Sequence, residues 1–316
     1  MKKITPVMLL IVVGLTAYEY SLWTMRYENV SQAEQIVMSL TERPYVYRVL
    51  IPWIARVLTF TGLRPEQALS ILVMLSAIAL VYGIKSLFEV VQPNMGLRGF
   101  ILSSLAVEIF MLVFFFECKV YDLATAAFFA FGIAWIAKRR HHLYYILFPF
   151  ACLNRETAFL LIFLFAVYEW RKMTVLSWIL SVTIQNLIFI SIRLLLMDMY
   201  ADNAGTVLIF RPIYNLLGFL RFPLEGVLHW SAFSTVIYLS LRNRRSNPSV
   251  LNVSFLLLLP ILMVLYILFG GVFEVRVFAE VYPLAWVLCW QNSIQIHEPV
   301  SLKKGNYILD VPRGEQ

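Results

Sequence analysis

A polar run inside an apolar stretch is the first sign of chemistry in this sequence. The segment Leu143–Trp170 is almost wholly apolar and aromatic, yet Asn-Arg-Glu-Thr stands at residues 154–157. An arginine at the centre of a membrane helix costs about 2.5–3.5 kcal/mol on insertion scales, so it normally faces a cavity or a partner. A helix break at this depth also frees backbone groups, which need protein or water beside them. We therefore expect Asn154, Arg155 and Glu156 to line a hydrated cavity, with the two charges paired to one another or to other groups.

Other charged residues are expected on the same side of the membrane as this break. They are Glu28, Glu34, Arg48, Glu117, Asp122, Arg211, Glu274, Arg276 and Glu280. Arginines bind phosphate through paired N–H donors, and a carboxylate can deprotonate a hydroxyl nucleophile. A cavity that holds several residues of both kinds suits an anionic substrate whose reaction needs proton transfer.

These residues also have structural interpretations. Arg155 and Glu156 could form an ion pair that only supports the fold, and Arg48 could extend along an apolar surface to the interface. Glu28 and Glu34, taken singly, suit solvated loop positions better than catalytic ones. The charges before the last apolar segment could mark a helix end.

Composition indicates that these charges belong to a membrane protein. Of the 316 residues, 60% are hydrophobic, 15% aromatic and 14% charged, whereas soluble domains carry about 25% charged residues. The net charge is +7, but the placement of the basic residues indicates membrane lipids as partners and not nucleic acid.

Apolar segments account for most of the chain. They lie near residues 5–23, 67–88, 100–116, 122–137, 143–153, 157–169, 175–197, 226–241, 250–270 and 277–291. A helix that crosses a bilayer needs about 20 apolar residues, so the segments 143–153 and 157–169 are too short to span alone. They form either a re-entrant hairpin or one long, broken helix. We predict an all-α polytopic protein with about 8–10 transmembrane or half-membrane helices.

The basic residues predict the orientation of these helices. With the N-terminus in the cytoplasm and a hairpin at residues 143–169, the tight basic clusters all fall on the cytoplasmic side. One continuous helix would instead place the arginines at residues 242–245 outside. The segment Tyr47–Gly62 is too short and too charged to span, so we expect an interfacial helix in the first outer loop. We expect one membrane domain over residues 1–290 and a cytoplasmic tail over residues 291–316.

The potential ligands have no spacing that demands a metal. Cys118, Cys152 and Cys289 are far apart and form no CxxC pair, and His141 and His142 lie in a basic loop. We assign no metal ligand, although the carboxylates are compatible with a divalent cation. No Walker or Rossmann glycine pattern occurs, so we expect no nucleotide cofactor.

Four segments, taken in order, resemble a known superfamily. They are Arg43–Ala55 (RPYVYRVLIPWIA), Tyr121–Trp135 (YDLATAAFFAFGIAW), Leu153–Phe165 (LNRETAFLLIFLF) and Phe273–Leu284 (FEVRVFAEVYPL). Small bacterial members of the polytopic GT-C glycosyltransferase superfamily often have a Tyr-Arg-x-Leu-x-Pro segment, an Asp that opens a helix, an Arg-Glu-Thr turn and a final Glu-x-Arg segment. The chain resembles this superfamily from about residue 18 to residue 290.

The resemblance implies an inverting transferase that uses a polyprenyl-phosphate sugar as donor. It would act on the outer, periplasmic face of a bacterial inner membrane, with both termini in the cytoplasm. The family usually has a catalytic Asp in its first outer loop. This loop contains no Asp, and Glu28 is the closest match, followed by Glu34. Asp122 matches the Asp that opens a helix. It is the third candidate for the catalytic base, or it instead orients the sugar or the acceptor.

The resemblance also implies which residues bind the donor. Arg155 and Arg276 would hold the lipid phosphate, assisted by Arg48 and Arg211. Further substrate-binding candidates are Asn154, Glu156, Glu274 and Glu280. Many larger relatives carry a soluble outer domain that recognises the acceptor. We expect none here, so either the acceptor is a lipid-linked or other glycan or a partner supplies its recognition.

Two other functions use the same features. A transporter or flippase for a lipid-linked or anionic solute would also need a broken helix and buried charges, although the chain has no clear inverted repeat. A non-catalytic membrane subunit that binds a lipid or a partner would tolerate Glu in place of Asp in the first loop.

Overall fold

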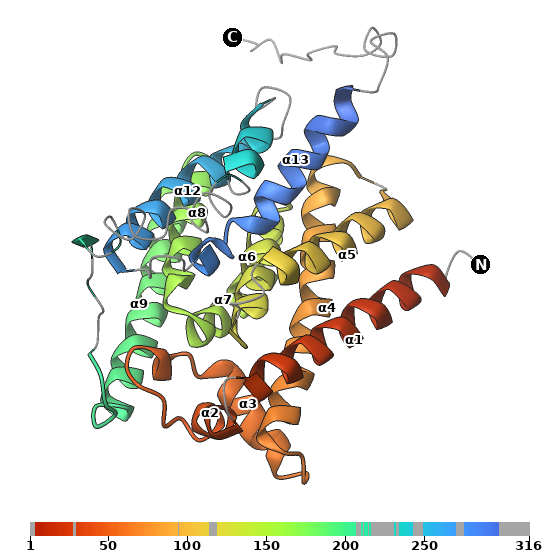
Figure 1. Cartoon of the computed structure of the whole chain (residues 1–316). Coiled ribbons are helices and arrows are strands. Elements are labelled where there is room, and N and C mark those ends of the chain that lie inside the picture. Colours follow the sequence, from red (N-terminus) through yellow and green to blue (C-terminus); the bar gives the residue numbers. More distant parts are fainter. Residues whose placement is uncertain are drawn as a thin grey trace, which may run out of the picture.

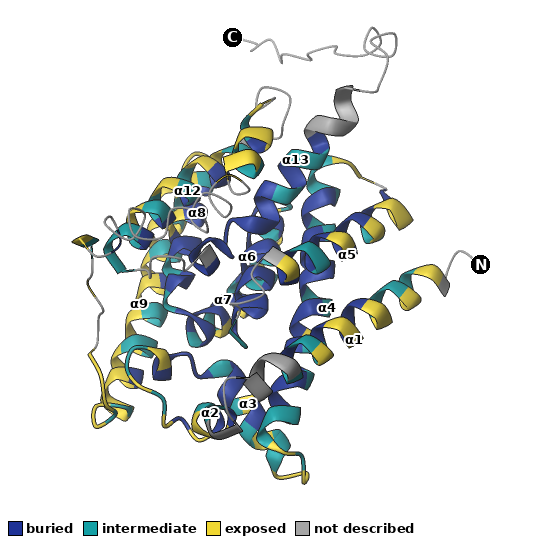
Figure 2. Ribbon diagram, viewed as in Figure 1, coloured by how far each residue is buried: buried dark blue, intermediate teal, exposed yellow. Residues whose placement is uncertain are grey.

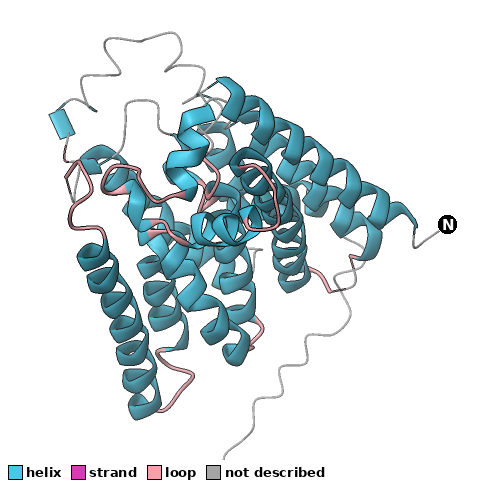
Figure 3. Cartoon of the chain, turned by 90° about the horizontal axis from the view of Figure 1, so that it is seen from below, coloured by secondary structure: helices cyan, strands magenta, loops and turns pink. Residues whose placement is uncertain are grey.

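The chain is all-α in its computed structural model. The structure describes residues 4–27, 30–93, 95–113, 119–206, 210, 212–213, 215, 231, 234–242, 249–269 and 275–296. Helices joined by loops make up these parts, and they contain no β-strand (Figure 3). The fold class predicted from the periodic apolar segments is therefore confirmed.

The elements follow the predicted apolar segments closely. The helices are α1 (Ile4–Tyr27), α2 (Val30–Val37), η1 (Tyr45–Tyr47), α3 (Leu50–Thr59), α4 (Pro65–Val91), α5 (Gly96–Val113), α6 (Asp122–Ala137), α7 (His141–Asn154), η2 (Glu156–Ala158), α8 (Phe159–Glu169), α9 (Val175–Met199), α12 (Ser249–Phe269), η4 (Val275–Phe278) and α13 (Tyr282–Ile296).

Two elements differ from the sequence prediction, and one predicted segment is only partly described. Helix α2 was not predicted, because the polar sequence VSQAEQIV reads as loop. The last helix begins at Tyr282 and not at residue 277, since Pro283 fits the first turn of a helix and the preceding residues form the 3₁₀ turn η4. Of the predicted segment 226–241, the described residues are helical and the others lie outside the described part of the chain.

Helices α4 and α6 form the centre of the bundle (Figure 1). They pack closely because Gly83 faces Ala130, where a Cβ atom on the glycine would lie 2.9 Å from the alanine Cβ. Figure 2 shows both helices as mostly buried, with α1 and α9 exposing apolar residues on the outside. The core is therefore central, and the periphery of the bundle is also apolar.

In the part of the chain that the structure describes, four helices are long and apolar enough to cross a membrane. They contain the spans Thr5–Leu22, Pro65–Val91, Val175–Met199 and Val250–Phe269. Within α9 only Gln185 and Leu196 are buried, so most of this 25-residue apolar helix has no protein cover among the described residues. A soluble protein rarely exposes so much apolar surface, and lipid is the solvent that suits it.

Helices α7 and α8 form an antiparallel hairpin. His141, at the start of α7, lies 3.6 Å from Glu169, at the end of α8 (Nε2 to Oε1). Between these ends, Tyr144 donates its hydroxyl to the Leu161 carbonyl at 3.0 Å and stacks on Phe165. One continuous broken helix would keep these residues far apart, so the hairpin alternative is the one adopted.

The two ends of the bundle differ in character. At one end, Lys138 at the end of α6 donates to Ser86 and Glu89 near the end of α4. Helix α7 begins shortly after Lys138, at His141, so the open end of the α7–α8 hairpin is also at this end. At the other end lie the starts of α4 and α6 and the turn between α7 and α8. Of the buried charged residues that the structure describes, all but Glu169 gather at this second end.

Candidate functional site

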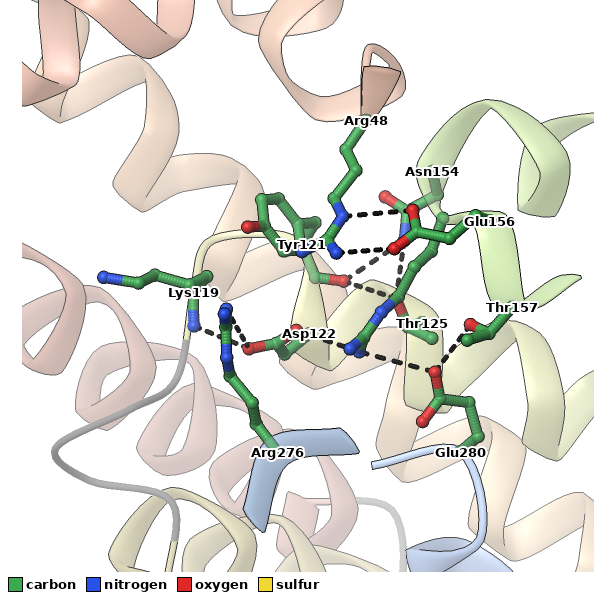
Figure 4. Close-up of polar contacts among 11 residues, drawn as sticks. Arg48, Lys119, Tyr121, Asp122, Thr125, Asn154, Glu156, Thr157, Arg276 and Glu280 are labelled. Atoms are coloured by element: carbon green, nitrogen blue, oxygen red, sulfur yellow. Dashed lines mark hydrogen bonds and ion pairs between the residues drawn. The ribbon is translucent and has the colours of Figure 1, made fainter. Parts of the chain in front are cut away.

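Four separate parts of the chain bring charged side chains together at this second end (Figure 4). Arg48 follows η1, Asp122 is the first residue of α6, and residues 154–157 connect α7 to α8. Arg276 lies in η4, and Glu280 lies in the turn between η4 and α13. The cluster combines arginines with carboxylates, as the sequence predicted for this side of the bundle.

Asp122 is fully buried and is held by cations and by a backbone donor. Its Oδ1 lies 3.2 Å from Arg155 Nη1, and its Oδ2 lies 3.9 Å from Arg276 Nη1. The Lys119 backbone N–H donates to Oδ2 at 2.7 Å, while the Lys119 side chain extends away from Asp122 (Figure 4). A buried carboxylate needs this compensation, because an unpaired charge in the interior is very costly.

Glu280 is the second buried carboxylate of the cluster. It accepts a hydrogen bond from the Thr157 hydroxyl at 2.6 Å and lies 3.4 Å from Arg155 Nη1. Burial raises the pKa of Glu280, although Arg155 and the Thr157 hydrogen bond oppose the shift. Arg155 therefore lies between two carboxylates, one on α6 and one before α13.

Glu156 pairs with Arg48 and not with its neighbour Arg155. Arg48 Nη2 lies 2.6 Å from Glu156 Oε1, and Arg48 Nε lies 3.2 Å from Oε2. Arg155 has an extended backbone (φ −156°, ψ 147°), and successive side chains of an extended segment point to opposite sides. Burial would raise the pKa of Glu156, but the Arg48 guanidinium outweighs it and holds the pKa far below its ordinary value.

Aromatic rings and an amide complete the surroundings of Arg48. Its guanidinium carbon lies 4.6 Å from the ring centroid of Tyr121 and 5.2 Å from that of Tyr45. Asn154 donates to the Tyr121 carbonyl at 3.1 Å and to the Thr125 hydroxyl at 2.8 Å, which fastens the end of α7 to the start of α6. The site is thus rigidly built from helix ends.

A pocket of about 410 Å³ lies beside this cluster, between α2, α3 and the start of α6. Three cationic residues line it: Arg48, Lys119 and Arg276. Arg48 Nη1 is buried and has no hydrogen-bond partner among the described residues. A pocket with three cations on its wall is suited to an anion, and arginine in particular suits phosphate.

The predicted site residues fall into three groups. Arg48 and Arg276 line the pocket, and Asp122, Asn154, Arg155, Glu156 and Glu280 form the cluster next to it. Glu34 is exposed on α2 and is not among the pocket-lining residues. Glu28, Arg211, Glu274 and Glu117 lie outside the described residues.

Sequence reasoning missed much of the pocket. Lys119, Tyr45 and Tyr121 were not singled out, and neither were the polar residues of α2 and the following loop. Lys119 and Tyr121 stand just before Asp122. A charged and aromatic run at the start of a helix was therefore the sequence signal that could have indicated them. Because the sequence did not predict α2, the pocket residues on this helix could not be recognised.

No metal site is found in the part of the chain that the structure describes. No group of three or more His, Cys, Asp or Glu residues there has an arrangement that could hold a metal ion. Compared with known proteins, the chain matches no protein-family model, no curated protein and no solved structure.

Proposed function

We propose that the chain is a membrane glycosyltransferase of the GT-C type, which transfers a sugar from a polyprenyl-phosphate donor to a lipid-linked or other glycan acceptor. One observation carries the proposal: Arg48, Lys119 and Arg276 line one pocket beside the buried carboxylates Asp122 and Glu280. An anionic leaving group needs fixed positive charge, which the three pocket cations supply, while Asp122 lies beside Arg276 and, with Glu280, holds Arg155.

The three cations of the pocket bind the donor phosphate in this proposal. The acceptor oxygen attacks the anomeric carbon, the bond from that carbon to the phosphate oxygen breaks, and the negative charge that develops on the phosphate is stabilised by the cations. Attack opposite the leaving group inverts the anomeric centre. Arg155, which does not line the pocket, acts as a positioning residue that holds Asp122 and Glu280.

A carboxylate accepts the proton of the acceptor hydroxyl. Glu28 and Glu34 remain the candidates, because both belong to the first loop and α2, whose residues Ala33 and Gln35 line the pocket. Asp122 is enclosed by Arg155, Arg276 and the Lys119 N–H, which suits it to orienting these groups.

We further propose a bacterial inner membrane, with both termini in the cytoplasm and the pocket on the periplasmic side. The support is the distribution of basic residues: Lys85, Lys138 and the start of α7 lie at the bundle end opposite the pocket. Basic residues near helix ends favour the cytoplasm.

The proposal is tested by transfer in reconstituted vesicles. Purified protein is given a mixture of polyprenyl-phosphate sugars and glycan acceptors, and release of polyprenyl phosphate is measured. We expect release by the wild type, and a loss of at least about a hundredfold for Arg276→Ala, as seen when a group that stabilises a developing anion is removed. Arg64→Ala is the matched control, because the Arg64 side chain is 76% exposed and lies outside the pocket.

Other outcomes separate the alternative functions. Movement of labelled lipid between leaflets without release of polyprenyl phosphate would identify a transporter. Donor binding with neither release nor movement would indicate a non-catalytic subunit, and either result would refute the transferase.

A further inference from the structure

The pocket has a second wall that the phosphate does not need. Four uncharged polar residues belong to it, Gln32 and Gln35 on α2 and Ser39 and Thr41 in the loop that follows, together with the apolar Ala33 and Ile36 of α2. Residues three apart share one face of a helix, and both glutamines line the pocket. Each amide offers both donors and an acceptor.

Ser39 gives independent evidence that this wall binds a ligand. Its side chain is buried, with 8% of the residue exposed, and its hydroxyl makes no hydrogen bond to any residue that the structure describes. Burying a hydroxyl without a partner costs about 1–3 kcal/mol. A ligand in the pocket can supply the missing hydrogen bond after a rotation of the side chain.

We propose that this polar wall (Gln32, Gln35, Ser39 and Thr41) binds the hydroxyl groups of the transferred sugar and determines which sugar is accepted. The inference rests on the proposed function, and it adds the position and the chemical class of the sugar. With the phosphate on Arg48, Lys119 and Arg276, the attached sugar fills the remaining part of the pocket. Amide and hydroxyl groups match the hydroxyl pattern of a sugar ring, whereas a hydrocarbon would leave them unpaired.

Glu42 affects which charge a bound sugar can carry. It is exposed and lines the same pocket, so it adds a negative charge near the polar wall. A carboxylate repels an acidic sugar and attracts an amino group. When the phosphate occupies the three cations, Glu42 favours an amino sugar over a uronic acid in the remaining part of the pocket.

The experiment measures binding and does not require transfer. The purified full-length protein in lipid nanodiscs is titrated calorimetrically with inorganic phosphate, glucose 1-phosphate, glucosamine 1-phosphate and glucuronic acid 1-phosphate. We expect glucose 1-phosphate to bind more tightly than inorganic phosphate. The double variant Gln32→Ala/Gln35→Ala should lose about tenfold or more in affinity for glucose 1-phosphate, as for two lost hydrogen bonds, and keep its affinity for phosphate.

Matched variants guard against misfolding and non-specific effects. Gln92→Ala changes an exposed glutamine at the far end of α4 and should bind every probe as the wild type does. Thr41→Val keeps the side-chain shape and should weaken only the sugar phosphates. Glu42→Gln should reduce the preference for glucosamine 1-phosphate over glucuronic acid 1-phosphate, whereas the exposed Asp202→Asn should not.

The results distinguish this inference from the proposed function. Suppose that phosphate binds, but the glutamine and threonine variants either weaken the binding of phosphate and sugar phosphates equally or weaken the binding of none of them. The polar wall is then not a sugar site, and only this inference fails. If the wild type binds none of the four probes, the anion pocket and the proposed function fail together.

Discussion

Arg155 at the break between α7 and α8 forms an ion pair with Asp122, the first residue of α6, at 3.2 Å. Both side chains are almost completely buried, and the same guanidinium also approaches Glu280. This single arginine therefore ties the hairpin, α6 and the turn before α13 together, and its loss should affect the fold and the pocket at once.

Arg155→Ala should destabilise the protein by about 3–5 kcal/mol, because removal of one partner leaves a buried carboxylate uncompensated. The measurement is the free energy of unfolding in detergent. Arg64→Ala, which changes an exposed arginine, should stay within about 0.5 kcal/mol of the wild type. Equal stability of the two variants would show that Arg155 is not buried among carboxylates.

Gly205→Ala should loosen the wall of the pocket. Gly205 has φ +92°, and a Cβ atom there would lie 2.6 Å from the Arg43 carbonyl oxygen. Arg43 is anchored in return, since its Nη2 donates to the Gly205 carbonyl at 2.9 Å. Gly62 is the matched control, with φ +89° and no atom within 4 Å of an added Cβ.

Both alanine variants carry the cost of a left-handed backbone, about 1–2 kcal/mol. The Gly205 variant alone carries the clash, so it should have the lower Tm and the weaker binding of inorganic phosphate. Identical Tm values would argue against the contact between the loop after α9 and the residues before η1.

Cysteine labelling should show that the pocket end and the basic end lie on opposite faces of the membrane. In a background with the three native cysteines changed to serine, Asp202→Cys should react with an impermeant maleimide on intact cells. Arg171→Cys should react only after permeabilisation, because it follows α8 at the basic end. The reverse pattern would invert the proposed orientation, and labelling of both sites in intact cells would contradict the span α9.

The ion pair between Arg48 and Glu156 should stabilise the fold at neutral pH, and this stabilisation should be lost as the pH falls. The folded pKa of Glu156 is lowered from its ordinary value of 4.5, so the contribution is complete above that value and is lost as the pH falls toward the folded pKa. Glu156→Gln should lower the Tm at pH 7, and the difference from the wild type should shrink below pH about 4. Asp202→Asn should keep the wild-type profile, and a difference that grows on acidification would contradict the pair.

Local signals in the sequence were sufficient for most helices. The start of α6 at Asp122 and the break at residues 154–157 follow from a charge at the edge of an apolar run. The choice of ion-pair partners did not follow, because Arg48 and Glu156 are 108 residues apart and the extended backbone at Arg155 separates it from its neighbour. The pocket was missed for a different reason. Helix α2 has only eight residues and lies in a stretch interpreted as one loop, although Val30, Ala33, Ile36 and Val37 have helical spacing.

The short hairpin has a consequence for the surrounding lipid. Helix α7 has 14 residues and α8 has 11, so they extend about 21 and 17 Å at 1.5 Å per residue. The hydrocarbon core of a bilayer is about 30 Å thick, so neither helix spans it. The turn that carries Arg155 is covered by the residues around η1, where the Val49 N–H donates to the Leu153 carbonyl at 2.9 Å. Ile146, Phe150 and Phe163 are exposed on the flanks of the hairpin, and lipid beside so short an apolar surface has to thin. The acyl-chain length of the host membrane should therefore affect how well the hairpin is accommodated.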